Sequence, residues 1–488
     1  MAPTIATVFF ALGISGLFVL DRDPTSRTSK ALWIPVIWVF LIGSRPVSMW
    51  LQTSIPVQSS ADQYAEGSPV DALVWGIMLA AGMVVLANRA PRVRAILRAN
   101  GPLLLYLAYC ALSTLWSEYP LVALKRWSKA VGDLVMVLIV LSDPDWSSAL
   151  KRLLTRTGFL LVPLSILFIK YYPALGRVYY DWSFTPQQIG VAVAKNQLGM
   201  VCLVIGLASV WRFLIAYRGR RGAYRTRRLI AHGANLAMVL WLLRTADSAT
   251  SKSCFILIGA LMVVTSLSRL GRKPGIVQLM AAAIVCGALV TLFFNPIGGL
   301  IESVGRDATL TGRTAIWGVV LKVAGSPIVG TGYESFWLGE RLQRIWDMNA
   351  KINESHNGYL EVFLNLGWVG VILLTVMLVT GYRNVVAAFR RDPNAGILRL
   401  AYFVTVLVYN LTEAAFKELN PIWFFFLLAI SVVPERKRFE QHTAGLQTSD
   451  HALVGSSYVA ASTGVPSQPL TRSTLPIEHN TEVIFGRL

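Results

Sequence analysis

The sequence predicts an all-α, polytopic integral membrane protein with about 11 to 13 transmembrane helices and one large extracytoplasmic loop. Of its 488 residues, 54% are hydrophobic and only 15% are charged, whereas a soluble protein typically carries about 25% charged residues. The apolar residues gather in runs of roughly 15 to 22, close to the ~20 residues of a straight bilayer crossing. The lysines and arginines gather in the short connections between these runs.

Thirteen apolar runs are candidate spans, and several are shorter than ~20 residues, so their ends are approximate. The first run is not preceded by a basic stretch and is followed by Asp21-Arg22-Asp23-Pro24 rather than by small residues. We therefore expect a retained helix and not a signal peptide. The candidate spans are 4–20, 31–47, 71–88, 101–116, 128–142, 157–170, 196–217, 229–245, 253–267, 276–294, 359–381, 399–413 and 421–433.

The cations in the connections predict the orientation. If every run crosses the membrane, most of the arginines and lysines fall on one side, and that side should be cytoplasmic. The connections 171–195 and 295–358 then lie outside. We expect a helix bundle over 1–294, a large extracytoplasmic (periplasmic) loop over 295–358, C-terminal helices over 359–433 and a disordered cytoplasmic tail over 434–488, which is rich in serine, threonine and glycine.

The formal net charge of +19 does not indicate a nucleic-acid partner. The cations lie in short loops, where the positive-inside rule already accounts for them. The four cysteines all lie within apolar runs and show no Cys-x-x-Cys spacing. Neither a zinc site nor a disulfide framework is therefore expected.

The stretch from Thr311 to Gly370 differs from the apolar remainder because it combines cations, carboxylates, a histidine and a Pro/Gly turn. Loops of such length are usually functional or disordered, and its tryptophans argue against disorder. Of the five histidines, only His356 is expected at the outer face. Several cations facing one outer cavity suit an anionic ligand, most simply a diphosphate. Tyrosine and tryptophan there suit either sugar stacking or an ordinary interfacial belt.

A series of short motifs follows a fixed order along the chain: Ser44-Arg45-Pro46, Trp116-Ser117-Glu118-Tyr119-Pro120, Lys195-Asn196-Gln197-Leu198-Gly199, Gly312-Arg313 with Trp317, Pro327 to Tyr333, and His356-Asn357-Gly358-Tyr359. Their order and spacing, together with the topology, resemble the O-antigen ligase and O-antigen polymerase superfamily. The resemblance is closest to its exopolysaccharide polymerase-like branch. It covers most of residues 1–433.

The resemblance implies a membrane glycosyltransferase of the bacterial inner membrane that needs no metal and no cofactor. Its donor would be a polyprenyl-diphosphate-linked oligosaccharide and its acceptor a growing glycan, brought together on the outer side. By motif, Arg313 matches the arginine of the large loop, which would hold the diphosphate, and His356 matches the proposed base. Membrane lipid, a flippase and a chain-length regulator are the implied partners.

One departure from the superfamily concerns the short link before the large loop. Many members carry Ser-Arg there, whereas this chain has Ser248-Ala249. Lys252, Arg244 or Lys195 are alternative sources of the missing charge.

Further candidate substrate-binding residues are Lys195, Asn196, Asn357, Arg126, Arg45 and Lys252. Each has a structural alternative. A cation at a span end can simply anchor the interface by snorkelling, Asn357 can cap a helix, and Lys252 can pair with Asp247. Glu354 and Glu361 flank His356 and are either orienting groups or solvated carboxylates.

The sequence leaves the exact reaction open. Polymerisation of lipid-linked repeat units is the first interpretation, and O-antigen ligase-type transfer of finished glycan to a lipid or protein acceptor uses the same chemistry. A flippase or transporter of lipid-linked glycans is an interpretation from another class, although transporters place ionisable residues near the bilayer midplane. A third interpretation is a scaffold for polysaccharide assembly.

Overall fold

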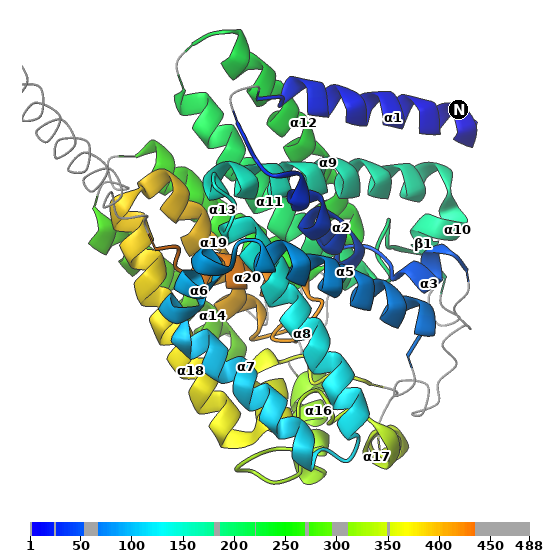
Figure 1. Cartoon of the computed structure of the whole chain (residues 1–488). Coiled ribbons are helices and arrows are strands. Elements are labelled where there is room, and N and C mark those ends of the chain that lie inside the picture. Colours follow the sequence, from blue (N-terminus) through cyan, green and yellow to red (C-terminus); the bar gives the residue numbers. More distant parts are fainter. Residues whose placement is uncertain are drawn as a thin grey trace, which may run out of the picture. The chain divides into compact units, whose positions relative to one another are not determined.

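The protein, seen in a computed structural model, is almost entirely helical (Figure 1). The structure describes residues 2–23, 26–52, 67–179, 186–219, 221–268, 273–294, 311–348 and 352–434. Within these ranges, two short antiparallel strands, β1 (Arg177–Val178) and β2 (Gln187–Gln188), are the only sheet. The predicted all-α class is confirmed, and the expected cytoplasmic tail lies outside the described residues from 435 onward.

Each of the thirteen predicted apolar runs overlaps a helix. These helices are α1 (Pro3–Leu20), α2 (Trp33–Ile42), α5 (Pro69–Ala87), α7 (Gly101–Ser113), α8 (Pro120–Leu141), α9 (Trp146–Tyr171), α11 (Lys195–Arg218), α12 (Ala223–Ala246), α13 (Ala249–Leu267), α14 (Pro274–Phe294), α18 (Gly358–Arg391), α19 (Pro393–Tyr409) and α20 (Pro421–Ile430). Shorter elements lie between them: η1 (Lys30–Leu32), α3 (Val47–Trp50), α6 (Ala90–Ala99), η2 (Thr114–Trp116), α10 (Pro173–Gly176), α16 (Thr311–Lys322) and α17 (Gly339–Met348).

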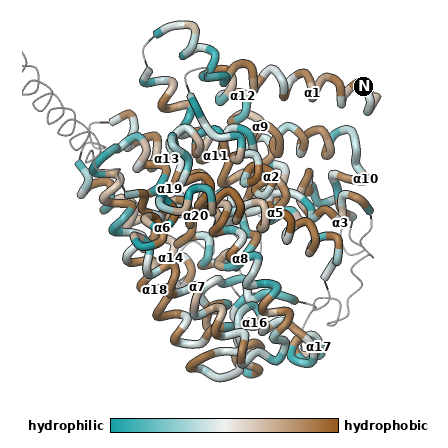
Figure 2. Tube along the Cα trace, viewed as in Figure 1, coloured by the Kyte–Doolittle hydropathy of each residue, from teal (hydrophilic) through white to brown (hydrophobic). Residues whose placement is uncertain are grey.

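The lengths of these helices make the chain a multi-pass membrane protein. Eight of the described helices are long and apolar enough to cross a bilayer, or nine if α6 and α7, which meet at 90°, form one broken span. The apolar helices α19 and α20, and α2 together with η1, are shorter. Hydrophobic residues are distributed along the whole length of the long helices (Figure 2). The short helix α17 is hydrophilic on average. The expected total of 11 to 13 crossings stays a prediction.

The centre of the helix assembly is formed by α11 and α20. In α11, 83% of its most apolar 18-residue stretch is buried inside the protein. All ten residues of α20 are buried. By contrast, only 11 to 17% of the corresponding stretches of α1, α5 and α14 is buried. These helices therefore present apolar side chains outward. Outward-facing apolar helices fit a lipid environment.

The Pro/Gly turn over residues 326–332 is fixed to a break in α18. Gly367 has φ +63° and ψ −166° within that helix, a conformation that favours glycine. A Cβ at Gly367 would lie 2.3 Å from the backbone of Ile328. Because the break frees carbonyl groups of α18, the amide of Gly332 can donate to the carbonyl of Asn365 at 2.8 Å. The turn thereby holds the segment after α16 against the first half of α18.

Candidate functional site

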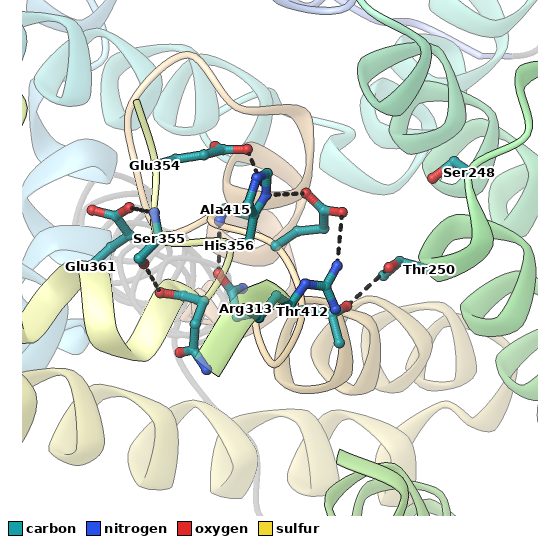
Figure 3. Close-up of polar contacts among 12 residues, drawn as sticks. Ser248, Thr250, Arg313, Glu354, Ser355, His356, Glu361, Thr412 and Ala415 are labelled. Carbon is teal, nitrogen blue, oxygen red and sulfur yellow. Dashed lines mark hydrogen bonds and ion pairs between the residues drawn. The ribbon is translucent and has the colours of Figure 1, made fainter. Parts of the chain in front are cut away.

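Three segments that are distant in the sequence meet at the beginning of α18 (Figure 3). They are residues 352–357, the first turn of α16, and the link 410–420 between α19 and α20. The indole Nε1 of Trp317 donates to the carbonyl of Ser355 at 2.9 Å and so docks α16 on the first segment. The hydroxyls of Thr250 and Thr412 lie 3.0 Å apart and join the start of α13 to the link.

The imidazole of His356 lies between two carboxylates. Its Nδ1 is 3.1 Å from Oε1 of Glu354 and 3.6 Å from Oε2 of Glu413. The histidine side chain is 31% exposed, so the ring remains accessible from solvent. Two carboxylates at Nδ1 favour a proton on that nitrogen, and this leaves Nε2 as the atom that can exchange a proton with a ligand.

Two cations extend this arrangement on either side. Nη2 of Arg313 lies 3.8 Å from Oε1 of Glu413, and Nζ of Lys417 lies 3.2 Å from Oε2 of Glu354. The side chains therefore form a chain of alternating charge in the order Arg313, Glu413, His356, Glu354 and Lys417. This row of side chains brings together Arg313 and His356, the two residues that the sequence motifs single out.

The charges in this chain shift the pKa values of its members. The neighbouring Glu354 and Glu413 raise the pKa of His356 to about 9, against the smaller opposing effect of burial. Burial alone would raise the pKa of Glu354, but Lys417 and His356 outweigh it and bring that pKa down to about 2. Burial likewise opposes the charged form of Lys417, yet the surrounding carboxylates raise its pKa overall. At neutral pH the imidazole is therefore mostly protonated.

Unusual backbone conformations occur in two of the segments that form the site. Five of the described non-glycine residues have positive φ, and two of them, His356 (51°) and Leu419 (53°), lie in the segments that meet at the site; the others are Gln52 (55°), Asp247 (52°) and Glu334 (49°). Such conformations cost roughly 1 kcal/mol or more each and are found preferentially at functional sites.

Hydrogen bonds to the backbone hold the His356 segment in place. Oδ1 of Asn357 accepts from the amides of the first turn of α18 at 3.0 Å, and so caps that helix. A carboxylate oxygen of Glu361 accepts from the amide of Ser355 at 2.5 Å. The amide of Gly358 donates to the carbonyl of Asn410 at 2.9 Å. The position of His356 is thus determined by α18 and by the link 410–420 together.

A cavity of about 230 Å³ lies beside Glu354. Its walls carry four carboxyl groups and two cations, together with apolar and aromatic groups. Burial raises the pKa of Glu334 to about 8, which makes this carboxyl a hydrogen-bond donor at neutral pH. The polar lining residues are Arg126, Glu334, Asn353, Glu354, Glu361, Lys417 and Glu418, and Trp337 lies beside them.

A second and larger cavity, of about 650 Å³, lies between α2, α5 and α8. Its lining is largely apolar and includes Trp38 and Trp75, but Lys125, Arg126 and Lys129 line it from α8. Arg126 belongs to both cavities and donates to the carbonyl of Glu334. The two cavities therefore adjoin at this arginine.

The other candidate substrate-binding residues have different surroundings in the structure. Asn357 uses its side-chain oxygen to cap α18, and Lys252 pairs with Asp247 at 2.8 Å, so both structural alternatives are observed. Lys195 and Asn196 are half-buried in the first turn of α11. Arg45 is 7% exposed, and it donates hydrogen bonds to the segment before α11.

Arg45 is held by the backbone of the segment before α11. Its Nε donates to the carbonyl of Ala192 at 3.2 Å, and its Nη2 donates to those of Gly190, at 3.1 Å, and Leu175. The guanidinium also lies over the ring of Trp50, 5.7 Å from the centroid. These contacts give Arg45 a role in shaping the fold, because its Nε and Nη2 donate to backbone carbonyl groups.

One group of ligand-type side chains could hold a cation. An oxygen of Glu354, an oxygen of Glu413 and a ring nitrogen of His356 lie within 4.8 Å of one another. The two carboxylates, however, already face Arg313 and Lys417. A metal ion at this position would have to compete with both cations and with the proton on His356.

Glu413 and Lys417 were not singled out by the sequence analysis. Glu413 stood at the end of a candidate span, and no motif includes it. A signal was nevertheless present, because the link after residue 409 carries several charged residues between two apolar runs. Charged side chains in so short a link are unusual enough to indicate a functional position.

Two comparisons with known proteins indicate which family this chain resembles. The O-antigen ligase domain model matches residues 234–375, a range that includes Arg313 and His356 and ends before Glu413. The chain is also 28% identical to the exopolysaccharide production protein ExoQ of Rhizobium meliloti (strain 1021) over 309 residues, which cover 59% of this chain and 67% of that protein. Taken with the membrane helices and the clustered motif residues, these matches support the resemblance to the O-antigen ligase and exopolysaccharide polymerase-like family that the motifs indicate.

Proposed function

We propose that this protein is a metal-independent membrane glycosyltransferase that polymerises polyprenyl-diphosphate-linked oligosaccharide repeat units into an exopolysaccharide or another surface polysaccharide. The reaction takes place at the outer face of the bacterial inner membrane, because the loops at the His356 end carry fewer cations than those at the other end. The similarity to an exopolysaccharide production protein supports the polymer product. A flippase that delivers repeat units and a chain-length regulator are the expected partners.

The observation that carries this proposal is the shared carboxylate of Glu413, which contacts both His356 and Arg313. Glycosyl transfer needs a base for the acceptor hydroxyl and positive charge for the leaving diphosphate. Nε2 of His356 takes the proton of the acceptor hydroxyl while Glu354 and Glu413 hold Nδ1. The acceptor oxygen forms a bond to the anomeric carbon, the bond from that carbon to the diphosphate oxygen breaks, and polyprenyl diphosphate leaves.

Arginine supplies the charge for the diphosphate because its fork matches two phosphate oxygens at once. Arg313 approaches from α16, and Arg126 approaches from α8. The apolar cavity between α2, α5 and α8 suits the polyprenyl chain, and Lys125 and Lys129 at its polar end add charge for the phosphates. Arg126 would then lie beside the diphosphate, between the polyprenyl chain and the oligosaccharide of the donor.

The smaller cavity beside Glu354 suits the acceptor glycan. Its carboxylates can accept hydrogen bonds from sugar hydroxyls, and Trp337 supplies an aromatic surface. A cavity of about 230 Å³ accommodates roughly one sugar residue. We therefore expect one terminal sugar of the acceptor to bind there, with its hydroxyl directed at His356.

A deletion strain tests the polymerase reaction against the ligase alternative. If the protein is a polymerase, its loss leaves single lipid-linked repeat units. If it is a ligase, its loss leaves lipid-linked polymer of full length. Mass spectrometry of the extracted polyprenyl-diphosphate glycans separates these outcomes, and complementation with the wild-type chain should restore polymer in either case.

A further inference from the structure

A polar cavity of about 380 Å³ lies at the opposite end of α11 from Lys195. It is bounded by the end of α1, the start of α9, and residues of α11 and α12. Arg212 of α11 lines it, about 25 Å along the helix from Lys195 at 1.5 Å per residue. The charged lining residues are Asp21, Arg22, Asp23, Lys151, Arg152, Arg156, Arg212 and Arg228.

The two carboxylates of this cavity are already paired. Oδ1 of Asp21 lies 2.8 Å from Arg212 and 3.0 Å from His232, and Oδ2 of Asp23 lies 3.0 Å from Arg228. Six cations line the cavity against two carboxylates. The protein therefore leaves the cavity with an excess of positive charge.

Two of the six cations have no ion-pair partner in the described ranges and so account for much of this excess positive charge. Neither the ammonium of Lys151 nor the guanidinium of Arg22 forms an ion pair or a hydrogen bond with another residue in the described ranges. Arg156 lies over the ring of Trp33, 4.2 Å from its centroid, an arrangement that leaves the edge of the guanidinium able to donate. The carboxylates of Asp145 and Asp392 also act on Lys151, but neither forms an ion pair with it in the described ranges. A partly buried site with more cations than carboxylates favours a bound anion.

Three buried polar atoms on the cavity wall also lack a hydrogen-bond partner among the described residues. They are Oγ of Ser26, Oγ1 of Thr155 and Nε of Arg228, and the last of these lies 3.7 Å from Oδ1 of Asp21 as an ion pair without a hydrogen bond. Thr155 is only 7% exposed. Buried hydroxyl and guanidinium groups are nearly always hydrogen-bonded in folded proteins, to protein or to ordered water. All three atoms can donate, so an oxygen-rich ligand would satisfy them together.

We propose that this cavity binds a phosphate-bearing anion, at a site separate from the candidate active site. A phosphate group presents several acceptor oxygens to donors on different sides, and this matches lysine, arginine and hydroxyl groups contributed by α9 and α12. The phosphate belongs either to the headgroup of an anionic phospholipid or to a soluble phosphate compound. This inference does not depend on the proposed glycosyltransferase reaction.

The test uses the full-length protein, freed of lipid in a neutral detergent. In one arm, the thermal unfolding midpoint is measured against inorganic phosphate, with sodium chloride at matched ionic strength as reference. In the other arm, the protein is placed in nanodiscs of phosphatidylcholine with or without phosphatidylglycerol. A saturable rise with phosphate indicates a soluble ligand, and a rise only with phosphatidylglycerol indicates a lipid headgroup.

Variants tie the effect to the cavity. Lys151→Gln should weaken the binding of the effective probe roughly tenfold, which corresponds to one charge-assisted contact. Thr155→Val keeps the shape but removes an unpartnered hydroxyl, so it should weaken binding while leaving the midpoint without ligand unchanged or higher. Arg94→Gln removes an exposed cation of α6 outside the cavity and should behave like the wild type.

The proposal is overturned if neither probe shifts the midpoint beyond the effect of salt. It is also overturned if Lys151→Gln and Thr155→Val respond to the probe as strongly as the wild type, because the anion would then bind elsewhere.

Discussion

His356 and Glu413 are brought to within 3.6 Å of each other, between Nδ1 and Oε2, although α18 and α19 separate them in the sequence. The other oxygen of Glu413 faces Arg313 at 3.8 Å. One carboxylate therefore connects the candidate base with the candidate diphosphate-binding arginine. We regard Glu413 as a positioning residue, since it acts through these two side chains.

Replacing Glu413 by glutamine should reduce polymer synthesis roughly 100-fold, because His356 loses a carboxylate that fixes its tautomer. Glu413 is also one of the groups that raise the pKa of His356. The acid limb of the pH–rate profile should therefore move to lower pH in Glu413→Gln. Glu340→Gln, at a site 88% exposed in α17, is the matched control. A wild-type pH profile in Glu413→Gln would contradict the positioning role.

The pH dependence of the wild-type reaction follows from the raised pKa of His356. Only the neutral imidazole can accept a proton, and below a pKa of about 9 most of the histidine is protonated. The rate should rise by about tenfold per pH unit on the acid side and level off near pH 9. Glycan polymerisation in membranes over pH 6 to 10 would measure this. A rate that falls as the pH rises through 9 would indicate that His356 acts as a cation and not as the base.

Metal removal tests the role of the group formed by Glu354, His356 and Glu413. Since Arg313 and Lys417 already face its carboxylates, we expect the activity of purified protein to be unaffected by EDTA. Added Mg²⁺ or Mn²⁺ should likewise have no effect. Loss of activity with EDTA and its recovery with either ion would instead identify the group as a metal site.

The break in α18 should be sensitive to substitution. Gly367→Ala places a Cβ 2.3 Å from the backbone of Ile328 at a residue with φ +63°, and should cost roughly 1–3 kcal/mol of unfolding free energy. Gly287→Ala in α14 meets no atom within 4 Å and should be neutral or stabilising. Thermal unfolding of the two variants in detergent compares them. Equal midpoints would show that the turn over 326–332 does not depend on the break.

The helices could be predicted because apolar length is a local property of the sequence. Each expected run overlaps a helix, yet α2 and α20 are shorter than expected, and α18 extends past the predicted end of its run at 381 to Arg391. Those ends depend on capping and on packing against neighbours, which composition does not describe.

The candidate site could be predicted only in part. His356 and Arg313 lie in recognisable motifs, whereas Glu413 and Lys417 lie in a link without one, and only the folded chain brings them to His356. Arg45 shows the opposite case. The sequence makes it a candidate substrate-binding cation, and only the fold shows that its Nε and Nη2 donate to backbone carbonyls. Charge in a sequence does not reveal which partner a side chain meets.

The most direct test of the proposed function is polymer synthesis in a deletion strain that carries His356→Ala or Arg313→Ala. Arg344→Ala is the matched control, because Arg344 lies in the same region, is 69% exposed and pairs with the exposed Glu340. With membrane levels verified, we expect both site variants to lose polymer and to accumulate lipid-linked repeat units, while Arg344→Ala makes normal polymer. Polymer of normal amount and length from both His356→Ala and Arg313→Ala would contradict the glycosyltransferase site and favour a scaffold or transport role.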